Sequence, residues 1–459
     1  MPIPIIPRVC AALLALALCA CASARPAPPP APGTAAAPPD AEVQQVRAAA
    51  IPITGAETDY DALVRMVGDA RFVFLGEATH GTHEFYRERA RITERLIRDL
   101  GFSAIAVEGD WPDGRRVDRF IHGEGPDAPE RALAGFAEGF PQWMWANTDI
   151  RDLIVRLRAM NRGRPPGEGV SFYGLDVYSL FESADSVLAY LRIADPTAAA
   201  EAERGYGCFR RHRPDPQRYG LAAASGAGSC QAQAEQVAAR MAARHAARAP
   251  GMDREASFAA LQHARVVQNA EEYFRLLYQG GESTWNRRDQ HMAETLDAIL
   301  AHLAEQGRTP RVVVWAHNTH SGDARHSDMG ERGELSVGQV MRERHDGHTV
   351  LIGFTTYGGT VMAAEEWDAP GRVRRLNPGW PESYAGLFHQ TGIPAFFLPF
   401  RGNAELSAAL AGPRLERAVG VVYAPATELQ SHYFPARLPQ RFDAVIHIDS
   451  TTAVTPVRP

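Results

Sequence analysis

Residues 72–110 read FVFLGEATHGTHEFYRERARITERLIRDLGFSAIAVEGD. Two short apolar runs, Phe72–Leu75 and Ala104–Val107, lie on either side of Glu84–Leu100, which has apolar residues at helical intervals. Short apolar runs bounded by turn residues are typical of buried strands, and the helical intervals are typical of one buried helix face. The segment therefore predicts a strand–helix–strand unit, from which parallel sheets are built.

The same alternation continues along the chain. We expect a helix at Ile150–Met160 and further strands at Ser171–Gly174, Val312–Trp315, Val350–Phe354, Ala395–Leu398, Val421–Tyr423 and Val445–Ile448. Because strands alternate with helices, the sequence predicts an α/β fold with a mostly parallel central sheet flanked by helices. Between residues 180 and 306 the strand pattern gives way to Ala-, Glu-, Gln- and Arg-rich stretches, so we expect a largely helical insertion there.

The composition allows a sizeable core and argues against one class of partner. Of the 459 residues, 45% are hydrophobic and 22% are charged, which is ordinary for a globular enzyme. The net charge is −6 and no basic tract stands out, whereas binding to nucleic acid needs a positive surface. We therefore expect a small-molecule partner and no nucleic acid, and the sequence leaves the oligomeric state open.

The N-terminus resembles a bacterial lipoprotein signal. Arg8 precedes the apolar run Val9–Leu18, which is too short to span a bilayer as a permanent helix. The run ends in LCAC, residues 18–21, which resembles a lipobox with Cys21 as the acylated residue. We expect an envelope protein in the periplasm, anchored by lipid to the outer membrane and touching the membrane only there; an ordinary cleaved signal is the alternative.

The remaining cysteines agree with export. After a signal peptide at 1–21 and a Pro/Ala-rich tether at 22–44, the catalytic domain is expected at 45–459. Only Cys208 and Cys230 lie in that domain. Two cysteines in an oxidising compartment favour one disulfide, and the Gly- and Ala-rich segment between them would gain from a cross-link.

Ionisable and polar residues gather where the predicted strands end. Ligands of open parallel sheets bind beyond the carboxyl ends of the strands, so these side chains are expected to share one crevice. The residues are Glu77, His80, Glu108, Asp110, Trp111, Asp176, His317, His320 and Thr356.

Arg89 belongs to the same group although it lies on a helix. It falls four residues after Phe85, on the apolar stripe that continues to Ile92. An arginine on a buried face needs a carboxylate partner, because an unpaired buried charge is very costly. Glu77 and Glu108 are the two candidates.

The residue set favours hydrolysis by an activated water. No serine has the G-x-S-x-G context of a nucleophile elbow, and neither cysteine of the domain lies in a nucleophile-like setting. A histidine titrates near neutral pH, so His80 can act as a general base, with Glu77 orienting its ring. Arg89, His317 or His320 could stabilise the oxyanion that forms when water attacks a carbonyl.

Two other readings of these residues stay open. The spacings His80-x-x-His83 and His317-x-x-His320 supply zinc-type ligands, which would make the protein a metal-dependent hydrolase. Alternatively, a non-catalytic envelope lipoprotein could bind a polysaccharide or lipid-like ligand through exposed tryptophans. The candidates for that role are Trp111, Trp143 and Trp145.

Long motifs in the chain resemble the erythromycin esterase family. They are LGEATHGTHEFYRERARITERLIRDLGFSAIAVEGDWPDGRRVDRFI at 75–121, FPQWMWANTDIRDLIVRLRAMN at 140–161, FYGLDVYSL at 172–180, WNRRDQHMAETLDAIL at 285–300, VVWAHNTHSGDAR at 313–325, GELSVGQVMRER at 333–344 and GFTTYGGTVMAA at 353–364. The resemblance spans roughly residues 45–450. It implies an α/β core with a helical insertion, a deep cleft, and opening of a macrolide lactone by activated water with no essential metal or other cofactor.

The resemblance also implies roles for individual residues. The family's general-base histidine matches His80, its supporting glutamate matches Glu77, and its paired histidines match His317 and His320. Arg89 and Glu108 match the helix arginine and the second-strand glutamate. We therefore assign catalysis to His80, Glu77, Arg89, Glu108 and His317, and substrate binding to His320, Asp110, Trp111, Asp176 and Thr356. The family name suggests antibiotic resistance, although some relatives carry the label of succinoglycan biosynthesis.

Overall fold

The computed structural model describes residues 39–137, 141–165, 168–248, 251–279, 284–367 and 369–457. The predicted signal peptide, Cys21 and most of the predicted tether lie outside the described residues. No helix of the described residues is long and apolar enough to cross a membrane.

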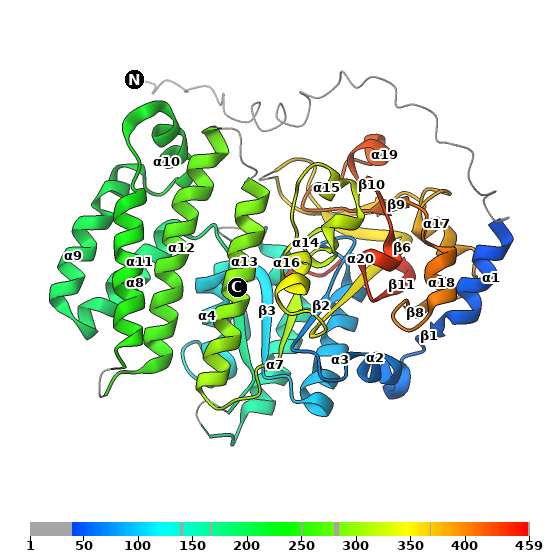
Figure 1. Cartoon of the computed structure of the whole chain (residues 1–459), viewed down its shortest axis with the longest axis horizontal. Coiled ribbons are helices and arrows are strands. Elements are labelled where there is room, and N and C mark those ends of the chain that lie inside the picture. The colour runs from blue at the N-terminus through cyan, green and yellow to red at the C-terminus, as the bar shows by residue number, and fades with distance from the viewer. Residues whose placement is uncertain are drawn as a thin grey trace. The chain divides into compact units, whose positions relative to one another are not determined.

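A nine-stranded sheet forms the centre of the fold, in the order β1-β8-β11-β6-β2-β5-β3-β4, with β7 paired to β6 (Figure 1). Its strands are β1 (Ile51–Pro52), β2 (Phe72–Leu75), β3 (Ala104–Asp110), β4 (Ser171–Asp176), β5 (Val312–Trp315), β6 (Thr349–Ala363), β7 (Arg372–Leu376), β8 (Ala395–Pro399) and β11 (Ala444–Thr451). From β11 to β4 all neighbours pair parallel, whereas β1, β7 and β8 pair antiparallel. The predicted α/β class with a mostly parallel sheet is confirmed.

One predicted strand is wrong. Residues Val421–Tyr423 form no strand, and Val422 makes only an isolated bridge to Ala364. Tyr423 is buried in a small cluster that includes Val361 and Val419. Burial alone explains the apolar run, which lies between β9 (Arg414–Arg417) and β10 (Tyr433–Ala436), a separate antiparallel pair.

Side chains alternate between the two faces of the sheet, and each face has its own core. Val73 and Leu75 of β2 face the core under α2 (Asp61–Val67), α3 (His83–Leu100), α4 (Trp111–Ile121) and α7 (Thr148–Asn161). Phe72 and Phe74 face the core under α13 (Thr284–Glu305), α16 (Val337–Arg344) and α17 (Tyr384–His389). Helices therefore cover both faces, as the fold class requires.

The predicted helical insertion is present as a bundle with a core of its own. It contains α8 (Leu180–Ala194), α9 (Pro196–Tyr206), α10 (Pro216–Ala222), α11 (Gln231–Ala246) and α12 (Arg254–Gln279). Figure 1 shows these green helices gathered beside α13, which packs on the sheet. Cys208 and Cys230 form the predicted disulfide within this bundle.

The fold begins earlier than expected. Helix α1 (Pro39–Ala49) starts inside the segment assigned to the tether, which was expected to reach residue 44. Val46 is fully buried in the core and Arg414 forms an ion pair with Glu42. The burial of Val46 and the ion pair of Glu42 hold this short helix against the domain. Its Pro- and Ala-rich start made it look like part of the tether.

Helix α3 carries Arg89 and begins one residue before the predicted helix at Glu84–Leu100. Gly101 ends it in the left-handed conformation, with φ of 69°. Thr82 precedes the helix but its side chain makes no capping hydrogen bond, because it pairs with the hydroxyl of Thr79.

The short helices elsewhere are α5 (Pro129–Leu133), α6 (Gln142–Trp145), α14 (Asn318–Ser321), α15 (Asp328–Glu331), α18 (Ala404–Ala409), α19 (Glu428–Ser431) and α20 (Leu438–Arg441).

Candidate active site

Four neighbouring strands deliver the predicted residues to one edge of the sheet. The order β2-β5-β3-β4 is parallel throughout, so the carboxyl ends of these strands lie side by side. Glu77 and His80 follow β2, Glu108 lies in the last half of β3, Asp176 ends β4, and His317 and His320 follow β5.

Arg89, Glu77 and His80 form a buried chain of hydrogen bonds. The Nη2 of Arg89 lies 2.7 Å from Oε2 of Glu77, and Oε1 of Glu77 lies 2.9 Å from Nδ1 of His80. Relative exposure is 0% for Arg89, 1% for Glu77 and 7% for His80. The inward-facing arginine thus pairs with Glu77 rather than Glu108, and the carboxylate fixes the orientation of the imidazole.

Aromatic rings enclose the guanidinium of Arg89. It lies over the rings of Tyr86 and Trp315, 4.4 and 4.7 Å from their centroids. The quadrupoles of these rings attract the cation. Arg89 is therefore shielded from solvent, and it can influence a bound molecule only through Glu77.

A second cluster is organised by Arg288 of α13. Its Nε and Nη2 bind the two oxygens of Asp176 at 2.9 and 2.5 Å, and Nη2 also lies 2.9 Å from Oε1 of Glu108. Sequence reasoning missed Arg288. Its signal is the one that revealed Arg89: Arg288 precedes Met292 by four residues and so shares the inward stripe of its helix.

Glu108 connects this cluster to the histidines. Its Oε2 accepts a hydrogen bond of 2.8 Å from the backbone N–H of His317, and Oε1 lies 3.4 Å from Nε2 of His320. Burial raises the pKa of a carboxyl, but the positive charge of Arg288 and the backbone N–H of His317 outweigh burial and hold the pKa of Glu108 well below its usual range. Glu108 is therefore a fixed negative charge.

Both ring nitrogens of His320 are engaged. Its Nδ1 lies 2.9 Å from both oxygens of Asp289, and its Nε2 accepts from Nη1 of Arg288 at 2.9 Å. The ring also stacks on Trp285, with centroids 4.2 Å apart and planes within 9°. His320 is held on three sides, and its partners Asp289 and Trp285 were not expected from the sequence.

His317, in contrast to His320, has only one ring nitrogen in a hydrogen bond among the described residues. Its ring lies 4.9 Å from that of His80, centroid to centroid. Its Nδ1 accepts from the backbone N–H of Thr319, so Nε2 carries the proton of the neutral ring. That Nε2 is buried without a hydrogen-bond partner among the described residues. Burial, and then the charge of His80, hold the pKa of His317 well below its usual range.

Three residues assigned to substrate binding are buried and make contacts within the fold. Asp110 accepts backbone hydrogen bonds from Tyr178 and Ser179, and burial together with Asp176 raises its pKa. Trp111 is 2% exposed and stacks on Tyr173 with centroids 5.6 Å apart, because the turn into α4 directs it into the core. The hydroxyl of Thr356 bonds to the carbonyl of Gly358 on the same strand and to the hydroxyl of Thr451 on β11.

The tryptophans expected to form an exposed binding platform are buried. Trp111 lies in the core, and Trp143 and Trp145 are only 6% and 1% exposed. The indole nitrogen of Trp145 donates to the carbonyl of Glu108, which ties it to the polar cluster from behind. These rings therefore cannot form an exposed platform.

His83, one of the four histidines whose spacing suggested a metal site, does not join the other three. His83 lies apart from the other histidines on α3, where its Nδ1 pairs with Asp149 at 2.8–2.9 Å. Throughout the described ranges, no group of three or more His, Cys, Asp or Glu side chains is arranged to hold a metal ion.

Comparisons with known proteins identify the family of this chain. A model of the erythromycin esterase family matches residues 97–451. The chain is 23% identical over 415 residues to an erythromycin esterase type II from Escherichia coli, covering 86% of this chain and 93% of that relative.

Solved structures share the fold. A succinoglycan biosynthesis protein superposes with a TM-score of 0.73 at 22% identity, covering 91% of this chain and 98% of the other. A mutant of the erythromycin esterase EreC in its open conformation gives a TM-score of 0.61 at 18% identity, covering 88% and 96%. Because the family model spans well over half of the sequence, the chain belongs to the erythromycin esterase family.

Proposed function

We propose that this protein hydrolyses an ester or lactone bond of a bulky, macrolide-type substrate with a water molecule activated by His80. The observation that carries the proposal is the buried Arg89–Glu77–His80 chain. Glu77 accepts from Nδ1 of His80, which leaves the Nε2 lone pair as the basic atom. A positioned general base of this kind contributes roughly 10²–10⁴-fold to the rate.

Arg89 is a positioning residue in this mechanism. It is fully buried and paired with Glu77, so it has no access to a substrate. Its guanidinium orients the carboxylate, and the carboxylate in turn stabilises the imidazolium that forms when His80 takes a proton.

His317 is the donor best placed for the oxyanion. His320 already uses both ring nitrogens, whereas Nε2 of His317 has no partner in the described structure and its ring lies next to His80. A neutral imidazole held in one tautomer can polarise a carbonyl without a change of charge. Glu108 fixes this histidine through its backbone N–H.

The proposed reaction consumes one water molecule and needs no other co-reactant. The water oxygen bonds to the carbonyl carbon while its proton passes to Nε2 of His80, and the carbonyl oxygen becomes an oxyanion facing His317. Collapse of this intermediate breaks the bond to the alkoxide oxygen, which takes the proton back from His80. The products are a carboxylic acid and an alcohol, joined in one molecule when the substrate is a lactone.

Substitution of His80 tests the base. Purified protein should add one water to at least one member of a macrolide, lactone and ester panel, as read by mass spectrometry. His80→Ala should abolish turnover and keep the thermal midpoint, whereas His83→Ala, a histidine outside the cluster, should retain turnover. Turnover that survives His80→Ala would refute the assigned base.

A metal-dependent reaction makes the opposite prediction for chelation. Turnover should persist in chelator, and protein purified without added metal should hold no stoichiometric zinc. Bound zinc together with chelator-sensitive turnover would replace the proposed mechanism by metal-assisted hydrolysis at the same residues.

We also propose that the enzyme is exported and anchored to the outer membrane through Cys21. The LCAC run at residues 18–21 supports this location. Cells fed a clickable fatty acid should label the parent and Cys19→Ser but not Cys21→Ser. Equal labelling of the two variants would contradict the anchor at Cys21.

A further inference from the structure

A cavity of about 240 Å³ lies between helices α8, α9 and α11, and shares no residue with the histidine cluster. Drug-sized ligands occupy pockets of about 300–1,000 Å³, so this space suits a smaller molecule than a macrolide. We propose that it binds a medium-chain fatty carboxylate.

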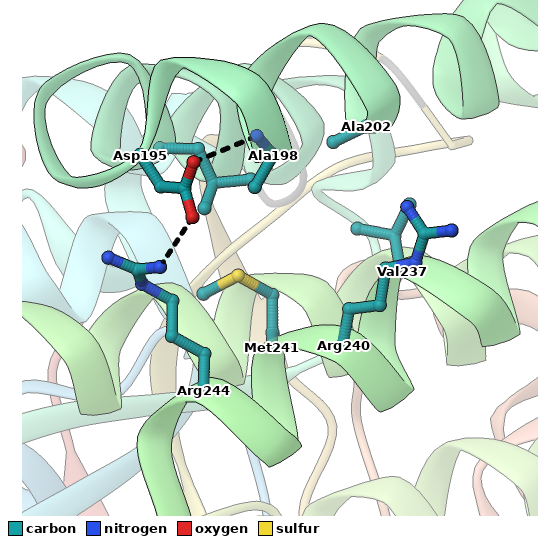
Figure 2. Close-up of a pocket in the computed structure, with 8 residues that line it drawn as sticks. Asp195, Ala198, Ala202, Val237, Arg240, Met241 and Arg244 are labelled. Atoms are coloured by element: carbon teal, nitrogen blue, oxygen red, sulfur yellow. Dashed lines mark hydrogen bonds and ion pairs between the residues drawn. The ribbon is translucent and has the colours of Figure 1, made fainter. Parts of the chain in front are cut away.

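Small side chains on α9 create the space. Ala198 and Ala202 are one helical turn apart and face Val237 and Met241, which are one turn apart on α11 (Figure 2). The alanine side chains end at the methyl group, and Leu191 of α8 also lines the cavity. The interior is therefore apolar and matches an alkyl chain.

Two arginines supply positive charge to the same cavity. Figure 2 shows Arg240 and Arg244 rising from α11 toward α9. Arg244 donates to Asp195 at 2.9 Å and to the carbonyl of Ala194 at 2.8 Å. Its Nε is buried and has no hydrogen-bond partner within the described part of the chain.

The residues that line the cavity carry one more positive than negative charge, because Glu201, the partner of Arg240, lies outside the lining. Arg240 is 49% exposed and pairs only at the surface with Glu201, so it can reorient at little cost. The lining holds two cations and one carboxylate, Asp195, which is already occupied by Arg244 and by the backbone N–H of Ala198. A ligand carboxylate can therefore bind the two guanidinium groups while its chain enters the apolar space.

A chain-length series tests the proposal on the full mature protein. Sodium salts of straight-chain carboxylates from butanoate to dodecanoate are titrated by calorimetry below their micelle concentrations. Affinity should rise about fourfold for each added methylene and then level off once the cavity is full. Octanoate should bind at least tenfold more tightly than 1-octanol, which lacks the charge.

Matched variants locate the site. Ala202→Leu fills the cavity and should weaken octanoate binding at least tenfold, while Ala200→Leu, exposed on the same helix, should bind as the parent does. Arg240→Gln should weaken octanoate binding and leave octanol unaffected, whereas Arg218→Gln, exposed on α10, should change neither. Thermal midpoints verify that all variants are folded.

Two results would overturn the proposal. One is the lack of saturable binding by any member of the series, and the other is undiminished octanoate binding by folded Ala202→Leu. His80→Ala should bind octanoate like the parent, so the outcome is independent of the proposed esterase activity.

Discussion

The guanidinium of Arg288 and the carboxylate of Glu108 meet 2.9 Å apart although 180 residues separate them in the sequence. The same guanidinium holds Asp176 through two hydrogen bonds. One buried cation thus pairs with two buried carboxylates and joins the sheet to α13.

Removal of that cation should be strongly destabilising. In Arg288→Met, Glu108 and Asp176 would remain buried without their partner, which costs about 3–5 kcal/mol for a broken buried pair. Urea denaturation measures the loss. Arg332→Met, which removes an exposed ion pair with Asp328, should cost less than about 1 kcal/mol. Equal losses in the two variants would show that Arg288 has no special structural weight.

Glu77→Gln should separate catalysis from binding. The amide preserves shape but removes the charge that stabilises protonated His80, so kcat should fall about 10²-fold or more with little change in KM. Steady-state kinetics measure the split. Glu84→Gln, on the neighbouring turn and outside the cluster, is the control and should keep the parent values. A rise in KM with unchanged kcat would place Glu77 in substrate binding instead.

Gly81 should tolerate no side chain. A Cβ at this position would lie 2.0 Å from the carbonyl oxygen of Met362, and Gly81 follows His80 directly. Gly81→Ala must therefore displace backbone and misplace the imidazole, so we expect at least a tenfold loss of kcat/KM. Gly358→Ala on the same strand as Met362 has no atom within 4 Å of the new Cβ and should retain activity. Full activity of Gly81→Ala would show that the loop can shift freely.

The stability of the protein should fall in acid partly through His317. The pKa of His317 is depressed in the folded state, so the unfolded chain takes up a proton at a higher pH than the folded chain does. Its contribution is present above the unfolded pKa of about 6.5 and is lost as the pH falls. His317→Gln should therefore lose less stability than the parent between about pH 7.5 and pH 5, by up to about 1.4 kcal/mol per pH unit.

His83 gives the opposite sign and serves as the control. Asp149 raises its pKa, so its stabilisation is full below about pH 6.5 and is lost as the pH rises. His83→Gln should lose stability on the acid side relative to the parent. Parallel pH–stability curves for the parent and His317→Gln would contradict the assignment.

The sequence predicted the framework well because local periodicity decides it. The bounds of β2 and β5 match their apolar runs, and the inward position of Arg89 correctly required a carboxylate partner. Strand ends are also local signals, so the histidines and acids were found. Parallel pairing then brings them together without further information.

Long-range contacts explain what was missed. Arg288 and Asp289 lie on a helix that was expected to belong to the insertion, and nothing local shows that this helix returns to the sheet. Trp111 follows Asp110 in the chain, but the direction of the helix turn decides that the ring enters the core. The cores are formed by segments that are distant in the sequence. The sequence alone therefore did not reveal the cluster around Arg288 or the burial of the tryptophans.

The place of β5 in the sheet ties the assembly of the histidine cluster to a strand that follows the helical bundle in the sequence. Strand β5 pairs with both β2 and β3, but in the sequence it comes after the whole helical bundle. The sheet therefore cannot connect β2 to β3 until Val312–Trp315 is added between them. The strand that fills this position also carries His317 and His320 at its end. A chain that ends before β5 therefore lacks two histidines of the candidate site.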